Sequence, residues 1–351
     1  MSKRALGYSG LTGLLLALFA LASAAVVGAQ TSAPRIAFVI ATGPTGGTYF
    51  PVGEAIASIV SHPAGVYRCE KPGVCGPPGL IASVRTSPGA VFNVLAVNAD
   101  TVDAAMAQSD VIADAVAGRG LFKSAGAQKH VRVIADLFPE DVHLIAAKSA
   151  HIKTAADLRG KRVSLGATTS GTVVTARALL AAFRVPQRRL KMSNDASDVA
   201  AEKLSRGQLD AMFFVGGAPV PLIRELLDSG KAVLVPIDGD GRKRLLGQSH
   251  ALAAATVPAG LYPHTGKLET VGVRAILIVN DTLADAAVYA IARSLFNPAN
   301  RATLAGSQWS AQFIRIDTAA ADLPAPLHPG AMRFYAQAGK LPKKTATLGK
   351  T

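Results

Sequence analysis

Glycine and hydroxyl residues gather in one short stretch near the start of the chain, between an apolar run, 36–41, and a helical pattern that includes Val52 and Ile56. Glycine lets backbone approach a guest closely, and the first N–H groups of a helix attract negative charge. A plain tight turn would use the same glycines. The added hydroxyls favour an anion-binding loop made of Thr42, Gly43, Thr45, Gly46, Gly47, Thr48 and Tyr49.

A second stretch of the same kind, GATTSGT at 166–172, follows a predicted strand at 162–165. It precedes a predicted helix with Val173, Ala176 and Leu180 on one face. The pattern of strand, small-residue loop and helix therefore occurs twice. It offers a second set of backbone and hydroxyl donors from Thr169, Ser170, Gly171 and Thr172.

Two later strands share an Asp-Ala pair before a turn, Asp103-Ala104 in the first half and Asp210-Ala211 in the second. In open parallel sheets, ligands bind at the carboxyl ends of strands. The four loops should therefore converge on one cleft between two similar α/β lobes, and the later turns add Gln108, Ser109, Val215, Gly216 and Gly217.

No catalytic constellation accompanies these loops. The glycine loops lack the Gly-Lys-Ser/Thr ending of a P-loop, there is no GxSxG elbow, and the histidines show no metal-binding spacing. Glu140 and Asp141 are adjacent and should point to opposite sides, which makes them a poor acid/base pair. We interpret His143 as structural and the only tryptophan, Trp309, as a core residue. The sequence thus favours binding without turnover, with no metal and no cofactor.

The chain crosses between the predicted lobes at two apolar segments. The run 131–137 is predicted to end at Phe138-Pro139-Glu140, and a new strand, 142–147, to enter the second lobe. A later run, 271–279, is predicted to return the chain. We therefore expect hinge motion near 138–142 and 271–279, in a protein that is a monomer during its binding cycle.

Size and charge agree with such a protein. The chain has 351 residues, of which 50% are hydrophobic and 17% charged, which is enough for two domains. The net charge is +14, but the cations are scattered and aromatic residues make up only 5%. Nucleic-acid binding by stacking is therefore not indicated, and the charge is interpreted as solvated surface that steers anionic ligands.

The N-terminus resembles an export signal. Lys3 and Arg4 precede an apolar run, 11–27, and cleavage sites of small residues end at Ala24 and Ala29. An uncleaved membrane anchor is the alternative, since the run approaches spanning length. The cleavage-like residues favour removal of the segment and a periplasmic mature protein.

Cys69 and Cys75 are the only cysteines. An even number at close spacing in an exported chain predicts a disulfide, and the spacing is not the CxxC of a redox enzyme.

Four stretches, in this order, resemble the TAXI family, the substrate-binding subunits of one class of TRAP transporters: IATGPTGGTYFPVGEAI, NVLAVNADTVDAAMAQSD, ADLRGKRVSLGATTSGT and LHPGAMRFYAQAG. The resemblance implies a type II periplasmic binding protein fold, two α/β lobes joined by a hinge with a ligand cleft between them. Its predicted parts are a signal peptide at 1–29, a first lobe at 34–139 with a return at about 281–340, a second lobe at 140–280 and a basic tail at 341–351.

The resemblance also implies ligand-binding roles for the two loops, the two turns and Asn93. One departure is Ala90, which stands where the family usually has serine. The implied ligand is a small organic acid or an amino acid such as glutamate, and the implied partner is the fused membrane permease.

Three functions remain open at this point. A transport receptor would hand its ligand to a permease, and a periplasmic sensor would present its closed form to a signalling receptor. An exported enzyme on the same scaffold would need a nucleophile or an acid/base pair in the cleft, for which the sequence offers no convincing candidate. The sequence does not identify the ligand.

Overall fold

The structure is a computed structural model that describes residues 35–342. The predicted signal peptide, 1–29, and the basic tail from residue 343 onward lie outside these residues. Among residues 35–342, no helix has the length and apolar character that crossing a bilayer requires.

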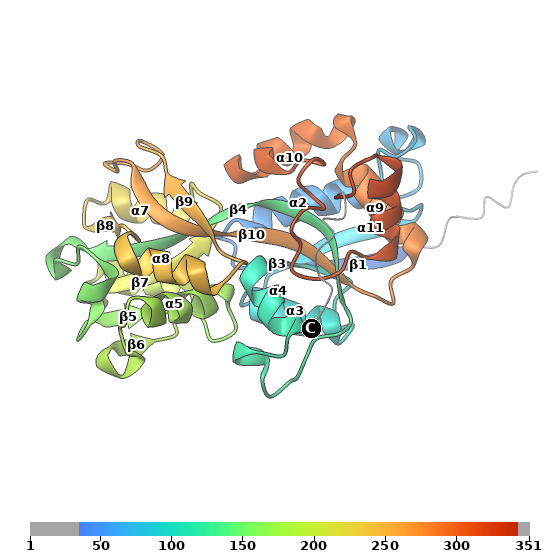
Figure 1. The fold of residues 1–351 in the computed structure, drawn as a ribbon. Coiled ribbons are helices and arrows are strands. Elements are labelled where there is room, and N and C mark those ends of the chain that lie inside the picture. Colours follow the sequence, from blue (N-terminus) through green and yellow to red (C-terminus); the bar gives the residue numbers. More distant parts are fainter. Residues whose placement is uncertain (1–34, 343–351) are drawn as a thin grey trace, which may run out of the picture. The chain divides into compact units, whose positions relative to one another are not determined.

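Parallel strands form the centre of each lobe (Figure 1). In the first lobe, β1 pairs in parallel with both of its neighbours, and in the second lobe β5 does the same. The strands of the first lobe are β1 (Ile36–Ala41), β2 (Leu80–Arg85) and β3 (Ala104–Gln108); those of the second are β5 (Arg162–Ser164), β6 (Lys191–Ser193) and β7 (Ala211–Gly216). Parallel strands buried on both faces explain the uninterrupted apolar runs in the sequence.

Two long antiparallel strands, β4 (Val131–Ala147) and β10 (Leu268–Asn280), pass through both lobes. The sheet order is β2-β1-β3-β10-β4-β7-β5-β6. Two short strands attach to the long pair in the second lobe: β8 (Ala232–Val235) on β4 and β9 (Ala253–Val257) on β10. The two lobes are therefore joined by one continuous pair of strands.

The predicted break at Phe138-Pro139-Glu140 is wrong, because β4 runs through it. Pro139 is registered with Arg274 of β10, and pairing of β4 with β7 begins only at Asp141. On its other side, Pro139 therefore needs no ladder partner, and a proline without an N–H is tolerated at such a locally unpaired position.

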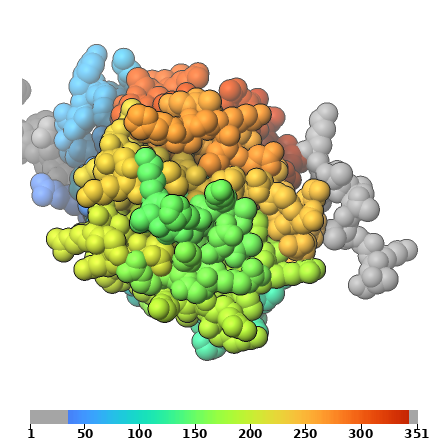
Figure 2. Space-filling view, turned by 90° about the vertical axis from the view of Figure 1, so that its left-hand side faces the viewer, coloured from blue at the N-terminus to red at the C-terminus, as the bar shows by residue number. Residues whose placement is uncertain are grey.

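Helices cover the strands of each lobe. In the first lobe, α2 (Tyr49–Val60), α9 (Asp285–Leu295), α10 (Arg301–Ser307) and α11 (Pro329–Gln337) share one apolar core, and α3 (Ala90–Asn98) and α4 (Ser109–Val116) belong to another on the opposite side (Figure 1). The second lobe has a single core with α5 (Gly171–Ala182), α6 (Ser197–Ser205), α7 (Pro221–Asp228) and α8 (Gly239–Gln248). Figure 2 looks onto this lobe, where the green to yellow-orange part of the chain forms most of the visible surface.

The helical patterns in the sequence correspond to these buried faces. Val52 and Ile56 of α2 and Val173, Ala176 and Leu180 of α5 are all buried, as their spacing predicts. Trp309 is not a core residue: it is 46% exposed and packs edge-on against Phe313 at 5.2 Å between ring centroids.

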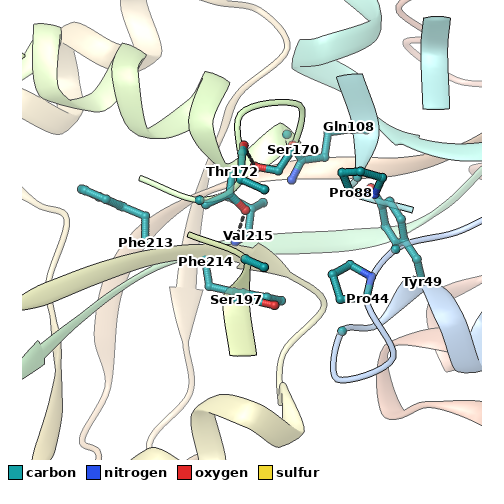
Figure 3. Close-up of a pocket in the computed structure, with 18 of the residues that line it drawn as sticks. Pro44, Tyr49, Pro88, Gln108, Ser170, Thr172, Ser197, Phe213, Phe214 and Val215 are labelled. Atoms are coloured by element: carbon teal, nitrogen blue, oxygen red, sulfur yellow. Dashed lines mark hydrogen bonds between the residues drawn. The ribbon is translucent and has the colours of Figure 1, made fainter. Parts of the chain in front are cut away.

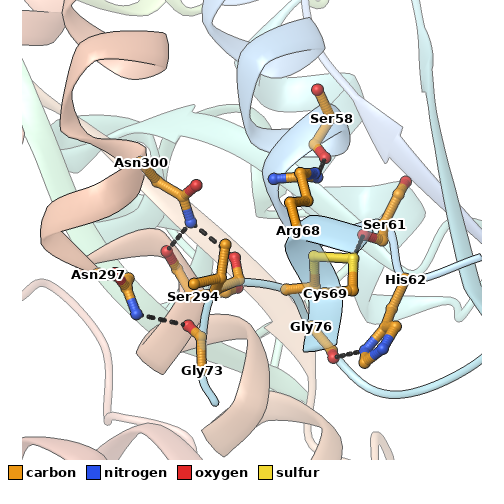
Figure 4. The surroundings of a disulfide bond; sticks show 12 residues. Ser58, Ser61, His62, Arg68, Cys69, Gly73, Gly76, Ser294, Asn297 and Asn300 are labelled. Atoms are coloured by element: carbon orange, nitrogen blue, oxygen red, sulfur yellow. Dashed lines mark hydrogen bonds between the residues drawn. A yellow bond between two sulfur atoms is a disulfide. The ribbon is translucent and has the colours of Figure 1, made fainter. Parts of the chain in front are cut away.

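The predicted disulfide between Cys69 and Cys75 is confirmed (Figure 4). The loop that it closes is held against the C-terminal part of the first lobe. Asn297 donates to the Gly73 carbonyl at 3.0 Å, and Asn300 to the Val74 carbonyl at 2.7 Å. The bond therefore fixes a loop that links early and late segments of the lobe.

We predict that Cys69→Ser/Cys75→Ser lowers the free energy of unfolding by about 2 kcal/mol, the entropic effect expected for so short a loop. Chemical unfolding of the two proteins measures the difference, and the double variant should still bind ligand. A loss of unfolding free energy above ~4 kcal/mol, or a loss of ligand binding, would contradict a purely entropic role of the disulfide.

Candidate functional site

A cavity of about 270 Å³ lies between residues of the two lobes. It brings together nine of the residues proposed from the sequence: Gly43, Gly47, Thr48, Tyr49, Gln108, Ser170, Gly171, Thr172 and Val215. Figure 3 shows the side chains of Tyr49 and Pro44 across from those of Thr172 and Phe214. The loops predicted to converge do so in the structure.

Helix N-termini dominate the polar part of the wall. Within residues 35–342, five helices begin there, namely α2 after Thr48, α3 after Gly89, α4 after Gln108, α5 after Ser170 and α6 after Ala196. The first N–H groups of a helix have no partner within the helix and carry partial positive charge. The wall thus favours a negatively charged group, and both lobes contribute to it.

Hydrogen bonds join the lobes around the cavity. The Gly217 N–H donates to Thr48 Oγ1 at 3.3 Å, and the Phe92 N–H donates to the Thr169 carbonyl at 3.1 Å. Deeper in the protein, Thr175 Oγ1 donates to Asp110 Oδ2 at 2.6 Å. The structure therefore has the lobes in contact, with Thr48 taking part.

Eight residues proposed from the sequence do not line the cavity: Thr42, Thr45, Gly46, Asn93, Ser109, Thr169, Gly216 and Gly217. Asn93 Nδ2 donates to the carbonyls of Thr42 and Met106, at 2.6 and 2.7 Å, and thereby ties α3 to β3 and to the residue that follows β1. Ser109 Oγ donates to the Ala251 carbonyl of the other lobe at 3.1 Å. These side chains therefore stabilise the backbone around the cavity and do not face a ligand in it.

Gln108 and Gly171 meet where the lobes are closest. The Gln108 side chain is buried and reaches from the end of β3 toward the Ser170 loop (Figure 3). A Cβ atom added at Gly171 would lie 1.6 Å from Gln108 Oε1 and 3.1 Å from the Ala90 Cβ. A side chain at position 171 would therefore exclude the observed approach of the two lobes.

The wall also contains a buried acid that the sequence indicates only as half of a poor acid/base pair. Glu140, in the middle of β4, is 1% exposed and accepts a hydrogen bond from the Tyr49 hydroxyl at Oε2, 2.7 Å away. Burial raises the pKa of Glu140 to about 8, and the charges of Asp110 and Asp141 act in the same direction. The Tyr49 hydrogen bond and Arg274 oppose the shift without cancelling it.

One signal in the sequence could have located this acid. Glu140 lies within β4, most of whose residues are apolar and buried, and a carboxyl in such a strand needs a polar partner or an unusual pKa. The other acid in the wall, Asp195, is already neutralised, since it accepts from Lys203 Nζ at 2.5 Å and from Ser193 Oγ at 2.6 Å.

The rest of the wall is mainly apolar, with Phe213, Phe214, Val215, Pro44 and Pro88. Among the residues that the structure describes, no lysine, arginine or histidine lines the cavity. His143 lies outside it, where Nε2 contacts the Tyr262 hydroxyl at 2.9 Å and burial lowers the pKa of the imidazole to about 4. In the same described range, no group of three or more potential metal ligands is placed to hold an ion.

We predict that Glu140→Gln stabilises the empty protein increasingly as pH rises. An acid with a raised pKa in the folded state is more protonated there than in the unfolded chain, so its contribution to stability is lost between the unfolded pKa, 4.5, and the folded pKa, about 8. The difference in unfolding free energy between variant and wild type should grow by at most about 1.4 kcal/mol per pH unit.

Thermal or chemical unfolding between pH 5 and pH 9 checks this difference. Asp110 and Asp141 have raised pKa values too, but both are present in the two proteins, so the effect of their own burial cancels in the comparison. Glu54→Gln, at an exposed position on α2, is the matched control and should show no such trend. A Glu140→Gln effect that is the same at every pH would contradict the buried, protonated carboxyl.

Comparison with known proteins places the chain among binding-protein folds. The model of the NMT1-like family matches residues 40–339. MatC from Rhodopseudomonas palustris with bound malate is 16% identical, with a TM-score of 0.52 over 86% of this chain and 97% of MatC. A periplasmic transporter structure is 13% identical, with a TM-score of 0.50 over 87% of this chain and 95% of that one. At these identities the likeness shows the fold, and the predicted two-lobed α/β architecture is confirmed.

Proposed function

The chain belongs to the NMT1-like family, and we propose that it is an exported solute-binding protein that captures a small organic anion and delivers it to a membrane permease. More specifically, we propose a periplasmic subunit of a TRAP transporter of the TAXI type. The TAXI motifs in the sequence support this assignment, and the signal-like N-terminus supports export.

The observation that carries the proposal is a cavity into which helices of both lobes direct their N-termini. A carboxylate placed there accepts hydrogen bonds from backbone N–H groups, and each hydrogen bond to a charged group contributes roughly 1.5–3 kcal/mol. MatC, which has the same fold, was solved with malate, a carboxylate. The wall supplies this recognition without a basic side chain among the described residues.

Ligand binding favours closure of the two lobes because the ligand binds the closed state more tightly. A ligand that contacts both lobes does so fully only when they are together, so it shifts the population toward that state. We propose that β4 and β10 bend where Phe138 faces Ala275 and Asp141 faces Gly272, inside the segments predicted as hinges. Each lobe keeps its own core during this movement.

The direct test is mass spectrometry of small molecules released from the denatured, exported protein. We expect an organic acid or an amino acid, and the released compound should bind again to the refolded protein. Recovery of a compound with no carboxylate, which binds again with micromolar affinity, would contradict the account of the cavity.

We predict that Gly171→Ala impairs closure, because the added methyl group occupies the space of the Gln108 side chain. Overpacking of this kind costs about 1–3 kcal/mol, so affinity for the released ligand should fall about 5- to 150-fold. Small-angle scattering should show a smaller ligand-induced compaction than in the wild type.

Two further variants make this test specific. Gln108→Ala/Gly171→Ala removes the clashing side chain and should recover the compaction. Gly247→Ala adds a methyl group to a helical glycine with open space around it and should behave as wild type. Full closure of Gly171→Ala alone would mean that the lobes do not approach in solution as they do here.

A further inference from the structure

We propose that Glu140 and Tyr49 recognise the ammonium group of the ligand, and that the ligand is an amino acid with an apolar side chain. This inference rests on the solute-binding function proposed above, and it specifies the ligand as a zwitterion that carries a carboxylate.

Glu140 has no cation of its own. Oε2 accepts from the Tyr49 hydroxyl at 2.7 Å, and within residues 35–342 the Oε1 atom has no hydrogen-bond partner. Arg274 is nearby but committed elsewhere: its Nε lies 2.9 and 2.7 Å from the two carboxyl oxygens of Asp136. A carboxyl in the wall of a cavity with no protein cation is a site that a positively charged guest would complete.

The surrounding charges favour the same guest. Asp110 and Asp141 act on Glu140 as negative neighbours, and Asp110 is turned toward Thr175, with the Thr175 hydroxyl 2.6 Å away. An anionic group beside Glu140 would be repelled by these carboxyls whenever they are ionised. An ammonium group is attracted by them and brings three N–H donors for Glu140 and the Tyr49 oxygen.

The other parts of the cavity suit the other parts of an amino acid. The helix N-termini offer the place for the carboxylate, and the rings of Phe213 and Phe214, with Pro44 and Pro88, offer an apolar surface. The volume of about 270 Å³ is large enough for an amino acid of the size of leucine.

This arrangement predicts that Glu140 releases a proton when a ligand with an ammonium group binds. In the empty cavity, burial raises the pKa of Glu140 to about 8, so the carboxyl holds a proton at pH 7. An ammonium group favours the ionised form and should expel that proton on binding. A ligand with only a carboxylate favours the protonated form and should expel none.

The experiment is calorimetry at pH 7 in buffers of different ionisation enthalpy, with three probes of one carbon skeleton. L-leucine carries both charged groups, 4-methylpentanoate lacks the amino group, and 3-methylbutylamine lacks the carboxylate. We expect leucine to bind about 10- to 100-fold more tightly than either analogue, with release of close to one proton. Valine, methionine and phenylalanine extend the panel.

Matched variants assign the effect to the proposed groups. Glu140→Gln should lose the preference for leucine over 4-methylpentanoate and release no proton, and Tyr49→Phe should weaken the preference. Glu54→Gln changes an exposed carboxyl of α2 that does not line the cavity, and it should keep the preference. Thermal unfolding confirms that each variant is folded.

The inference is overturned if 4-methylpentanoate or malate binds as tightly as every amino acid tested, if Glu140→Gln keeps the preference for leucine, or if no amino acid of the panel binds at millimolar concentration. Binding of malate with compaction of the protein would then leave the solute-binding function standing. If no compound of the panel binds and mass spectrometry finds no released ligand, both the amino-acid inference and the solute-binding function are contradicted.

Discussion

The antiparallel pairing of β4 with β10 is the constraint on which the rest of the structure depends. It runs from Gly272 opposite Asp141 to Asn280 opposite Val131, and its register shifts after Ala275 and after Leu277. Each lobe adds its parallel strands to this pair, so the cleft lies where the pair passes from one lobe to the other. The position of Glu140 in that passage makes one strand both the connection between the lobes and part of the cavity wall.

Local pattern was enough to predict the elements that bring the loops to the cavity. The apolar run of β1, the periodic faces of α2 and α5 and the paired cysteines are all short-range signals. The continuity of β4 was not predictable in this way. Whether Pro139 ends a strand depends on which neighbour pairs with it, and that neighbour, β10, lies more than a hundred residues later in the sequence.

For a similar reason, only some of the residues proposed from the sequence line the cavity. A hydroxyl or amide in a loop signals a hydrogen bond but not its partner. The Asn93 side chain donates hydrogen bonds to two carbonyls of its own lobe, whereas the Gln108 side chain extends toward the other lobe. In the sequence, the neighbour of Glu140 is Asp141, which makes a poor chemical partner. The hydrogen-bond partner of Glu140 in the structure is Tyr49, which lies far away in the sequence and belongs to the glycine loop near the start of the chain.

The composition of the wall suggests how binding and closure are coupled. Helix N-termini are fixed parts of the fold and attract an anion whether or not the lobes meet. Glu140 differs, because the cost of its burial appears only when water is excluded from the cavity. If the lobes separate as proposed, an open cleft hydrates the carboxyl, and closing without a ligand must either desolvate it or protonate it. A guest that neutralises the carboxyl removes this cost, so the same group that recognises the ligand disfavours closure of the empty protein.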